Sequence, residues 1–245
     1  MNWHCYRVPV CYFSAIIVEA CALGFGFWDK TLPQPTNPTT SHKKKMHSYC
    51  LGNKWSSLEG VDLSVKILVF TEGTILTNKR WIGVSREEVV KQVKKWSNLP
   101  KEELEKLQKS GDAPSPEYFA ASVPIGNSVR KIEAWKKQGA TIVYLASRRK
   151  SKELRIIRDI LKKYRFPEGQ LLSRKEGEDY KDVAEKAMPD VIVEDDCESI
   201  GGEEEMTYPG IRPELKSKIK SIVVKEFDGI DHLPDNAAEL MSYHN

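Results

Sequence analysis

The stretch that decides the fold is residues 65–74, which read VKILVFTEGT. Its first six residues are largely apolar and rich in β-branched side chains, and its last four are polar and include a glycine. A short apolar run that ends in turn residues is typical of a buried β-strand. The stretch therefore predicts a strand over 65–70 that is followed by a polar turn over 71–74.

Similar apolar runs recur along the chain and alternate with segments that have helical periodicity. The expected strands are 65–70, 141–146, 170–172, 191–193 and one within 216–226. The spacing of apolar residues predicts helices over 85–96, 100–110, 125–138, 152–164 and 179–188. Strands that alternate with helices predict a three-layer α/β fold, with a parallel Rossmann-like sheet and helices on both faces.

Polar side chains follow the three main strands at the points where they end. Thr71 follows the first strand, Ser147 follows the second, and Glu194 opens an acidic triplet after the third. In open parallel sheets, ligands bind beyond the carboxyl ends of the strands. These polar residues are therefore expected to meet at one edge of the sheet and to form the functional site.

Composition limits the classes of function. The chain has 245 residues, of which 40% are hydrophobic, so it is not a wholly disordered protein. Its 38 basic and 35 acidic residues leave a net charge of +3, which gives no strong nucleic-acid signal. Four of the five cysteines lie in the first 50 residues, and none has zinc-ligand spacing. The main body thus resembles a protein of a reducing compartment, and a cytoplasmic location is expected.

The first 62 residues differ from the rest and are predicted to be a poorly ordered N-terminal extension. They contain an apolar segment, 8–28, followed by a linker rich in proline, threonine and lysine. Glu19 lies near the centre of that segment, and an acidic residue there costs about 2.5–3.5 kcal/mol on membrane insertion. Membrane contact is possible only through residues 8–28. If they are a targeting segment, the protein is anchored in a membrane or exported.

The order and spacing of the polar clusters resemble the haloacid dehalogenase-like (HAD) superfamily of phosphohydrolases over about residues 65–234. The resemblance rests on the turn at Gly73-Thr74, on Ser147 after the second strand, on Lys181 and on the acidic triplet. It implies an α/β core over 63–235 with a small helical cap inserted at about 84–112. Residues 236–245 are expected to be a C-terminal tail.

The first motif departs from the family pattern. In the family, the first strand ends in Asp-x-Asp-Gly-Thr, where the first aspartate is the nucleophile and the second is the general acid and base. Aligning the turn puts Phe70 at the nucleophile position and Glu72 at the acid/base position. Phenylalanine can neither attack phosphorus nor bind a metal, so the resemblance implies that phosphoaspartyl catalysis is absent.

The remaining residues suggest a pocket for a phosphate and a cation. The expected phosphate-binding residues are Thr71, Gly73, Thr74, Ser147, Arg148 and Lys181, with Lys175 as a rival for Lys181. Oxygen ligands suit Mg2+, which takes one or two carboxylates. The expected metal ligands are Asp195, Asp196 and Glu194, with Asp195 foremost.

Three functions are consistent with these residues. The favoured one is a HAD-like protein with a degenerate site, which binds a phosphorylated small molecule or nucleotide with Mg2+ and does not turn it over. The second is a Mg2+-dependent phosphohydrolase in which Glu72 activates water. The third is a non-catalytic scaffold that binds a protein partner. Neither the substrate nor the oligomeric state follows from the sequence.

Overall fold

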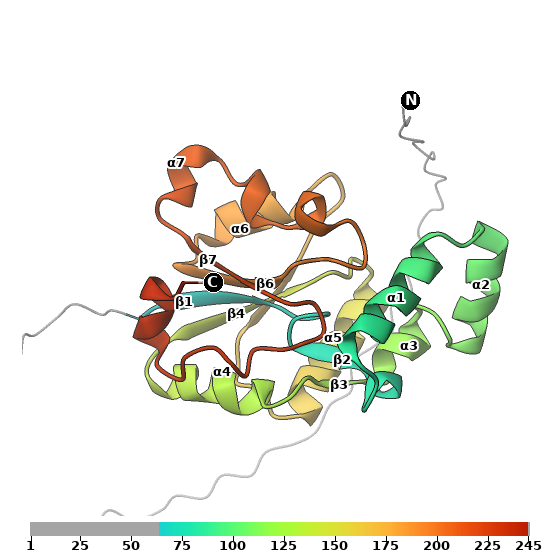
Figure 1. Ribbon diagram of the computed structural model, residues 1–245. Helices are drawn as coiled ribbons and strands as arrows, with labels where there is room; N and C mark the ends of the chain where they lie inside the picture. The colour runs from blue at the N-terminus through green and yellow to red at the C-terminus, as the bar shows by residue number, and fades with distance from the viewer. Residues whose placement is uncertain (1–63, 245) are drawn as a thin grey trace, which may run out of the picture. The chain divides into compact units, whose positions relative to one another are not determined.

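The computed structural model describes residues 64–244 (Figure 1). Its centre is a five-stranded sheet in the order β5-β4-β1-β6-β7, in which every neighbouring pair is parallel. The strands are β1 Lys66–Phe70, β4 Thr141–Ala146, β5 Gln170–Ser173, β6 Val191–Asp195 and β7 Lys220–Val224. The predicted α/β fold with a parallel sheet is confirmed, and the strand of the deciding stretch lies at its centre.

Helices cover both faces of the sheet because alternate residues of each strand point to opposite faces. Ile67 and Val69 of β1 belong to one apolar core, which includes Ile132 and Trp135 of α4. Leu68 belongs to the other core. The helices of the first core are α4 Ser128–Lys137 and α5 Ser151–Lys163, and those of the second are α6 Tyr180–Ala187 and α7 Pro213–Lys216. Short 3-10 helices, Gly202–Glu205 and Tyr208–Gly210, precede α7.

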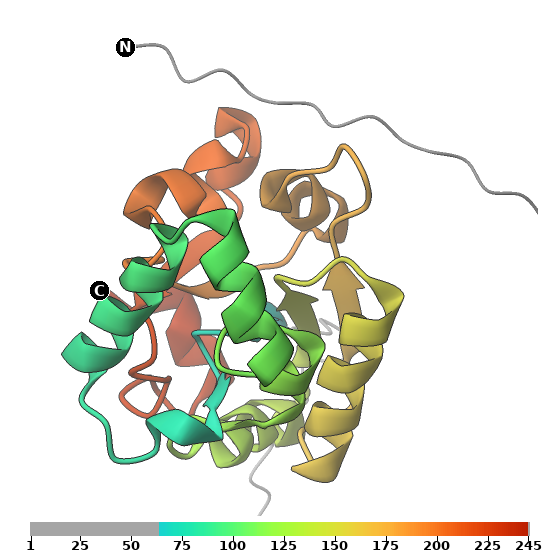
Figure 2. The same ribbon diagram turned by 90° about the vertical axis from the view of Figure 1, so that its right-hand side faces the viewer.

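A helical cap is inserted between two short strands that the sequence did not predict. These strands, β2 Leu76–Asn78 and β3 Ser122–Pro124, pair antiparallel. The insertion contains η1 Lys79–Trp81, α1 Arg86–Ser97, α2 Lys101–Ser110 and α3 Pro116–Ala120. Trp96, Tyr118 and Phe119 form a separate apolar core inside it. Figure 2 shows the cap helices in front of the carboxyl edge of the sheet.

The C-terminal segment, which was expected to be a tail, packs against the core. It forms the 3-10 helix η4 Ala237–Ser242, in which Leu240 is fully buried. Just before it, the ammonium of Lys131 donates to the carbonyl of Leu233 at 2.6 Å, and Trp135 Nε1 donates to the carbonyl of Pro234 at 2.9 Å. These contacts attach the segment to α4.

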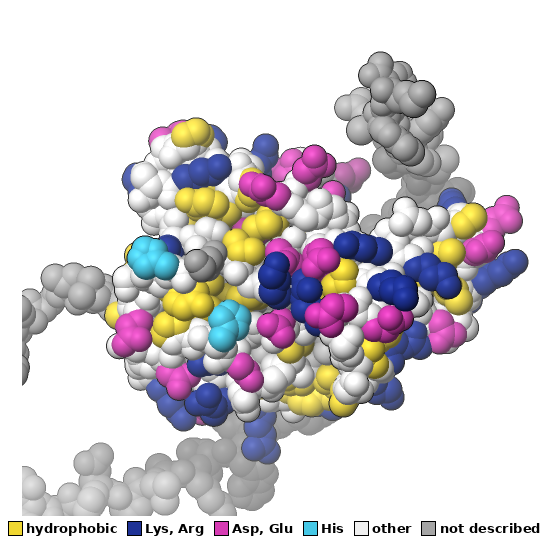
Figure 3. All heavy atoms as spheres, viewed as in Figure 1, with side chains coloured by type: hydrophobic (Ala, Val, Ile, Leu, Met, Phe, Trp, Pro, Cys, Tyr) yellow, Lys and Arg dark blue, Asp and Glu magenta, His cyan; other side chains and the backbone are white. Residues whose placement is uncertain are grey.

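Nothing in the described part of the chain resembles a membrane span. None of the helices within 64–244 combines the length and the hydropathy needed to cross a bilayer. The apolar segment 8–28 lies outside the described residues. On the face shown in Figure 3, basic and acidic side chains are interspersed and do not form a patch of one sign.

Candidate functional site

Polar side chains from five strands meet at the carboxyl edge of the sheet. Thr71 follows β1, Ser147 follows β4, Arg174 follows β5, Asp195 ends β6 and Glu226 follows β7. The structure thus brings together the strand ends that the sequence singled out, because all five strands are parallel. The side chains at this edge are named here the sheet-edge site. Some of them already have hydrogen-bond partners within the protein, and others do not.

The Glu72 carboxylate lies where a bound anion would be expected. Its Oε2 accepts a hydrogen bond from the backbone N–H of Ser147 at 3.0 Å and another from the Thr71 hydroxyl. The guanidinium of Arg148 approaches Oε1, with Nε at 3.5 Å. Thr71, Ser147 and Arg148 are three of the six residues predicted to hold phosphate. In this structure they surround a carboxylate of the protein itself.

Gly73 and Thr74 shape the turn after β1 and do not offer free hydrogen-bond donors to a ligand. Gly73 has a φ of +85°, and a Cβ at this position would lie 2.8 Å from Oδ2 of Asp195 and 3.3 Å from Cγ of Glu226. The Thr74 hydroxyl donates to the same Asp195 oxygen at 2.7 Å. Both residues therefore let two carboxylates approach the turn closely. The sequence analysis missed Glu226. It stands alone after its strand, whereas the acidic triplet after β6 is conspicuous.

The last side chain of β1 is the aromatic ring of Phe70. Phe70 is 9% exposed and meets the ring of Tyr180 edge to face, with the centroids 5.2 Å apart. Tyr180 opens α6, and burial raises the pKa of its hydroxyl. Two aromatic rings, Phe70 of β1 and Tyr180 of α6, therefore lie together at the end of the central strand, and Phe70 provides no nucleophile there.

Arg174 is the second residue of the site that the sequence reasoning missed. Its guanidinium carbon lies 3.6 Å from the centroid of the Tyr180 ring, and its buried Nε has no hydrogen-bond partner among the described residues. No acidic side chain within 64–244 forms an ion pair with it. A signal was present, because Arg174 follows β5 directly, just as Ser147 follows β4. The neighbouring Lys175, which the sequence offered as a rival for Lys181, is exposed.

Lys181 lies beside this group and not within it. It is in the first turn of α6, where its methylene chain packs against Gly210: a Cβ there would lie 3.2 Å from Cδ of the lysine. Together with Arg174 and Tyr180 it lines a hollow of about 260 Å3. Among the described residues, no hydrogen bond or ion pair joins Lys181 to Thr71 or Ser147. Lys181 thus shares this hollow with Arg174 and makes no direct contact with the groups around Glu72.

The three carboxylates of the acidic triplet contact different partners. Glu194 is buried and accepts from the backbone N–H groups of Thr207 at 2.7 Å and Tyr208 at 3.0 Å. The oxygens of Asp195 accept from Thr74 and from the N–H of Cys197. Burial raises the pKa of Asp195 to about 6.

The third carboxylate of the triplet, Asp196, is tied up in ion pairs. It lies 3.0 Å from the ammonium of Lys225 and 3.6 Å from the guanidinium of Arg86. Burial acts to raise its pKa, but the hydrogen bond from the Glu226 N–H and the charge of Lys225 hold the pKa below its usual value. Asp196 is therefore a charged partner for two cations of the protein.

Glu194, Asp195 and Asp196 do not converge as a three-carboxylate metal site. Within 64–244, no three His, Cys, Asp or Glu side chains converge as a metal would require. The reason is strand geometry: consecutive residues of β6 point to opposite faces, which separates Glu194 from Asp195. The three predicted ligands Glu194, Asp195 and Asp196 are thus not brought together at one point, and of the three Asp195 alone remains at the turn after β1.

Comparison with known proteins adds little to this picture. No protein-family model matches the chain, and no curated protein matches it significantly. Among solved structures, it is similar to the apo form of phosphoserine phosphatase, at 16% identity and a TM-score of 0.33. That match covers 74% of this chain and 100% of the other. A likeness at this level says nothing about activity.

Proposed function

We propose that the chain is a HAD-like protein with a degenerate active site, which binds the phosphate group of a phosphorylated small molecule and forms no phosphoaspartyl intermediate. The sequence motifs support the HAD-like part, since Thr71, Ser147 and Asp195 lie at the ends of the neighbouring parallel strands β1, β4 and β6, with a helical cap inserted between β1 and β4. The ring of Phe70 supports the degenerate part. Covalent catalysis of this type needs a nucleophile at that position.

The observation that carries the binding proposal is the free guanidinium of Arg174. It lies at the carboxyl edge of the sheet with its Nε buried and no acidic partner in the described residues. Arg174 is partly exposed and lines an open hollow, so its guanidinium is accessible to an anion, while its buried Nε has no hydrogen-bond partner in the described residues. Guanidinium groups bind phosphate through two parallel hydrogen bonds. Tyr180 holds the group in place by stacking against it.

One observation favours the alternative in which Glu72 activates water on a phosphate ester. Its Oε1 atom is buried and accepts no hydrogen bond within the described residues, so a lone pair remains free. A general base must reach the proton that it removes. The two functions differ in what the loss of the Glu72 charge would do to phosphate binding and to hydrolysis.

Calorimetric titration with p-nitrophenyl phosphate tests the proposal, because the same compound reports hydrolysis by its colour. We expect saturable binding without release of p-nitrophenol, whether or not Mg2+ is present. Arg174→Ala should weaken binding about tenfold or more, the effect of losing a charge-assisted hydrogen bond. The matched control is Arg149→Ala, which removes an equal charge from an exposed position after β4. Equal weakening in both variants, or no binding at all, would leave a scaffold as the better description.

A further inference from the structure

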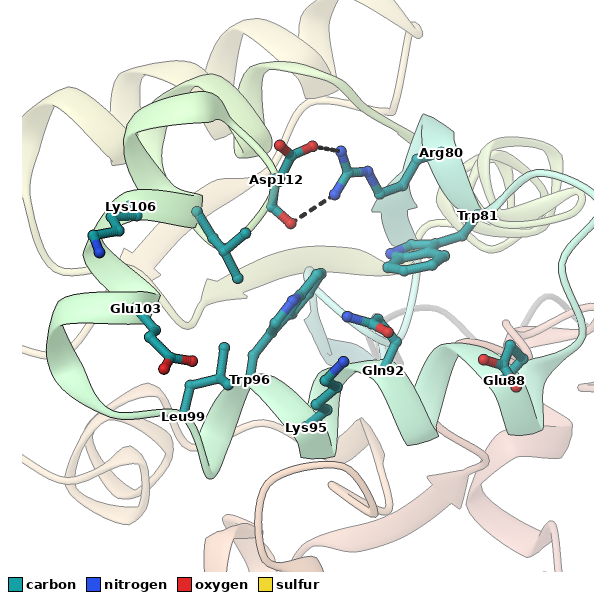
Figure 4. A pocket seen from close by; sticks show the side chains of 11 residues that line it. Arg80, Trp81, Glu88, Gln92, Lys95, Trp96, Leu99, Glu103, Lys106 and Asp112 are labelled. Atoms are coloured by element: carbon teal, nitrogen blue, oxygen red, sulfur yellow. Dashed lines mark hydrogen bonds and ion pairs between the residues drawn. The ribbon is translucent and has the colours of Figure 1, made fainter.

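A groove of about 760 Å3 opens on the cap, between η1, α1 and α2 (Figure 4). This volume lies within the range of about 300–1,000 Å3 that is usual for small-molecule sites. The groove is lined by none of the residues of the sheet-edge site. Its walls combine an aromatic floor with polar side chains that have few partners.

Two tryptophan rings form the floor. The ring centroids of Trp81 and Trp96 lie 5.9 Å apart, and the ring planes are inclined by 46°. Trp81 Nε1 donates to the hydroxyl of Tyr118 at 2.8 Å, which holds the indole in place and uses its only donor. Trp96 is 4% exposed, whereas Trp81 is partly open to solvent. The groove thus offers an immobilised indole surface for stacking.

The charged groups around the floor are of two kinds. Some are paired: Arg80 with Asp112 at 2.7 Å, and Glu88 with Lys91 at 3.6 Å. The others lack a side-chain partner within 64–244 and reach in from both helices, namely Gln92 and Lys95 from α1, and Glu103 and Lys106 from α2. The free groups are therefore an amide, a carboxylate and two ammonium groups.

The groove and the sheet-edge site lie on opposite sides of α1. Residues 88, 92 and 95 of α1 line the groove and recur every three or four positions, so they share one side of the helix. Arg86 donates instead to the carbonyl of Glu226 at 2.9 Å, and Lys94 approaches Glu198 at 3.3 Å. These two residues lie about half a turn away around α1. A ligand in the groove is therefore separate from one at the sheet edge.

We infer that this groove is a second binding site, for a planar aromatic ring that carries an anionic group, of the chemical class of a nucleoside monophosphate. The indole of Trp81 stacks on the base, a contact worth about 1–3 kcal/mol per base in other proteins. The amide of Gln92 matches the paired donor and acceptor on a base edge. Glu103 accepts from sugar hydroxyls, and the ammonium groups of Lys95 and Lys106 neutralise the phosphate.

Tryptophan fluorescence during titration with adenosine monophosphate tests the inference on the full-length chain. Two tryptophans line the groove, whereas none lines the hollow beside Arg174. We expect saturable quenching. Adenosine, which lacks the charge, should bind about tenfold more weakly. Ribose 5-phosphate, which lacks the ring, should leave the fluorescence unchanged even if it binds at the sheet edge. The experiment therefore distinguishes a failure of nucleotide binding in the groove from a failure of phosphate binding at the sheet edge.

Variants of α2 provide the decisive comparison. Lys106→Ala should weaken adenosine monophosphate about tenfold, whereas Lys109→Ala should leave it unchanged. Both lysines are exposed on the same helix, but only Lys106 lines the groove. Equal loss in both variants would mean nonspecific attraction and would overturn the inference, as would an absence of quenching in the wild-type chain. Trp81→Leu should abolish the signal, and thermal unfolding shows whether that variant is folded.

Discussion

The sheet-edge site and the cap groove contain similar side chains but use them differently. At the sheet edge, Glu72, Asp195 and Glu226 accept hydrogen bonds from nearby donors, whereas Arg174 Nε and the second carboxylate oxygen of Glu72 have no hydrogen-bond partner among the described residues. In the groove, two lysines, a glutamate and a glutamine surround an aromatic floor without binding one another. The difference teaches that a cluster of conspicuous polar residues can be internally satisfied. The groups left over then indicate where a ligand binds.

The largest expected effect tests whether the sheet edge is a tightly closed network. Gly73→Ala places a Cβ 2.8 Å from Asp195 at a φ of +85°, so we expect a loss of about 3 kcal/mol in the free energy of unfolding. Gly177→Ala is the control: its φ is +80°, but a Cβ there meets nothing within 4 Å, so about 1 kcal/mol of backbone strain remains. Urea unfolding measures both. Equal losses would mean that the edge is open.

The second prediction concerns pH. Burial is the main cause that raises the pKa of Asp195 to about 6 and that of Glu226 to about 7. The folded chain therefore binds more protons than the unfolded chain between about pH 4 and 7, and stability falls as the pH rises through this window. We expect a loss of about 2 kcal/mol from these two coupled groups.

The check is urea unfolding of the wild-type chain and of Glu226→Gln at pH 5 and pH 8. The variant should show a clearly smaller decrease, because the amide does not titrate. Glu87→Gln, at an exposed position on α1, should keep the wild-type decrease. An unchanged pH dependence in Glu226→Gln would show that the buried network does not hold the extra protons.

The third prediction separates the two readings of Glu72. Glu72→Gln removes the charge that occupies the Ser147 N–H and faces Arg148. If Glu72 takes the place of an anion, binding of p-nitrophenyl phosphate should tighten about tenfold. Glu198→Gln, which removes a carboxylate near Arg86 at the same edge, should have little effect. A loss of measurable hydrolysis in Glu72→Gln, with unchanged binding, would instead establish Glu72 as the base of a hydrolase.

The smallest effect is expected in the cap. Trp81→Phe keeps an aromatic face in the groove but loses the hydrogen bond to Tyr118. We expect a decrease of about 1 kcal/mol in stability, and a change in affinity for adenosine monophosphate of less than about threefold. Thermal unfolding and calorimetry measure the two quantities. A large loss of affinity in a folded Trp81→Phe protein would mean that ligand binding requires the indole held in place by its hydrogen bond to Tyr118, and not simply an aromatic face.

Periodicity predicted much of the fold correctly. The five strands of the sheet and the five longest helices appear where alternating and helical patterns indicated them, because apolar periodicity reflects which side of an element is buried. The antiparallel pair of β2 and β3 was missed, since strands of three residues are too short to show an apolar pattern in the sequence. The C-terminal segment was taken for a tail because its buried Leu240 lies among exposed residues.

The site was predicted less completely, and the reason differs from residue to residue. The sequence placed Ser147 and Asp195 at the edge of the sheet where the structure has them, because both lie at the ends of strands with clear apolar runs. Arg174 was missed because β5 is short and only partly buried. Lys181 was assigned from motif order, which does not reveal that its chain packs against Gly210.

By itself, the sequence determined which segments are strands, that the strands are parallel, and that polar residues gather at their carboxyl ends. These properties follow from local periodicity and from the connection rules of α/β folds. Only the tertiary structure decided which polar groups are already bound to one another. The Glu72 carboxylate meets a backbone N–H 75 residues away in the chain, and the two walls of the groove come from different helices. Hydrogen-bond partners depend on distances in space, which residue order does not specify.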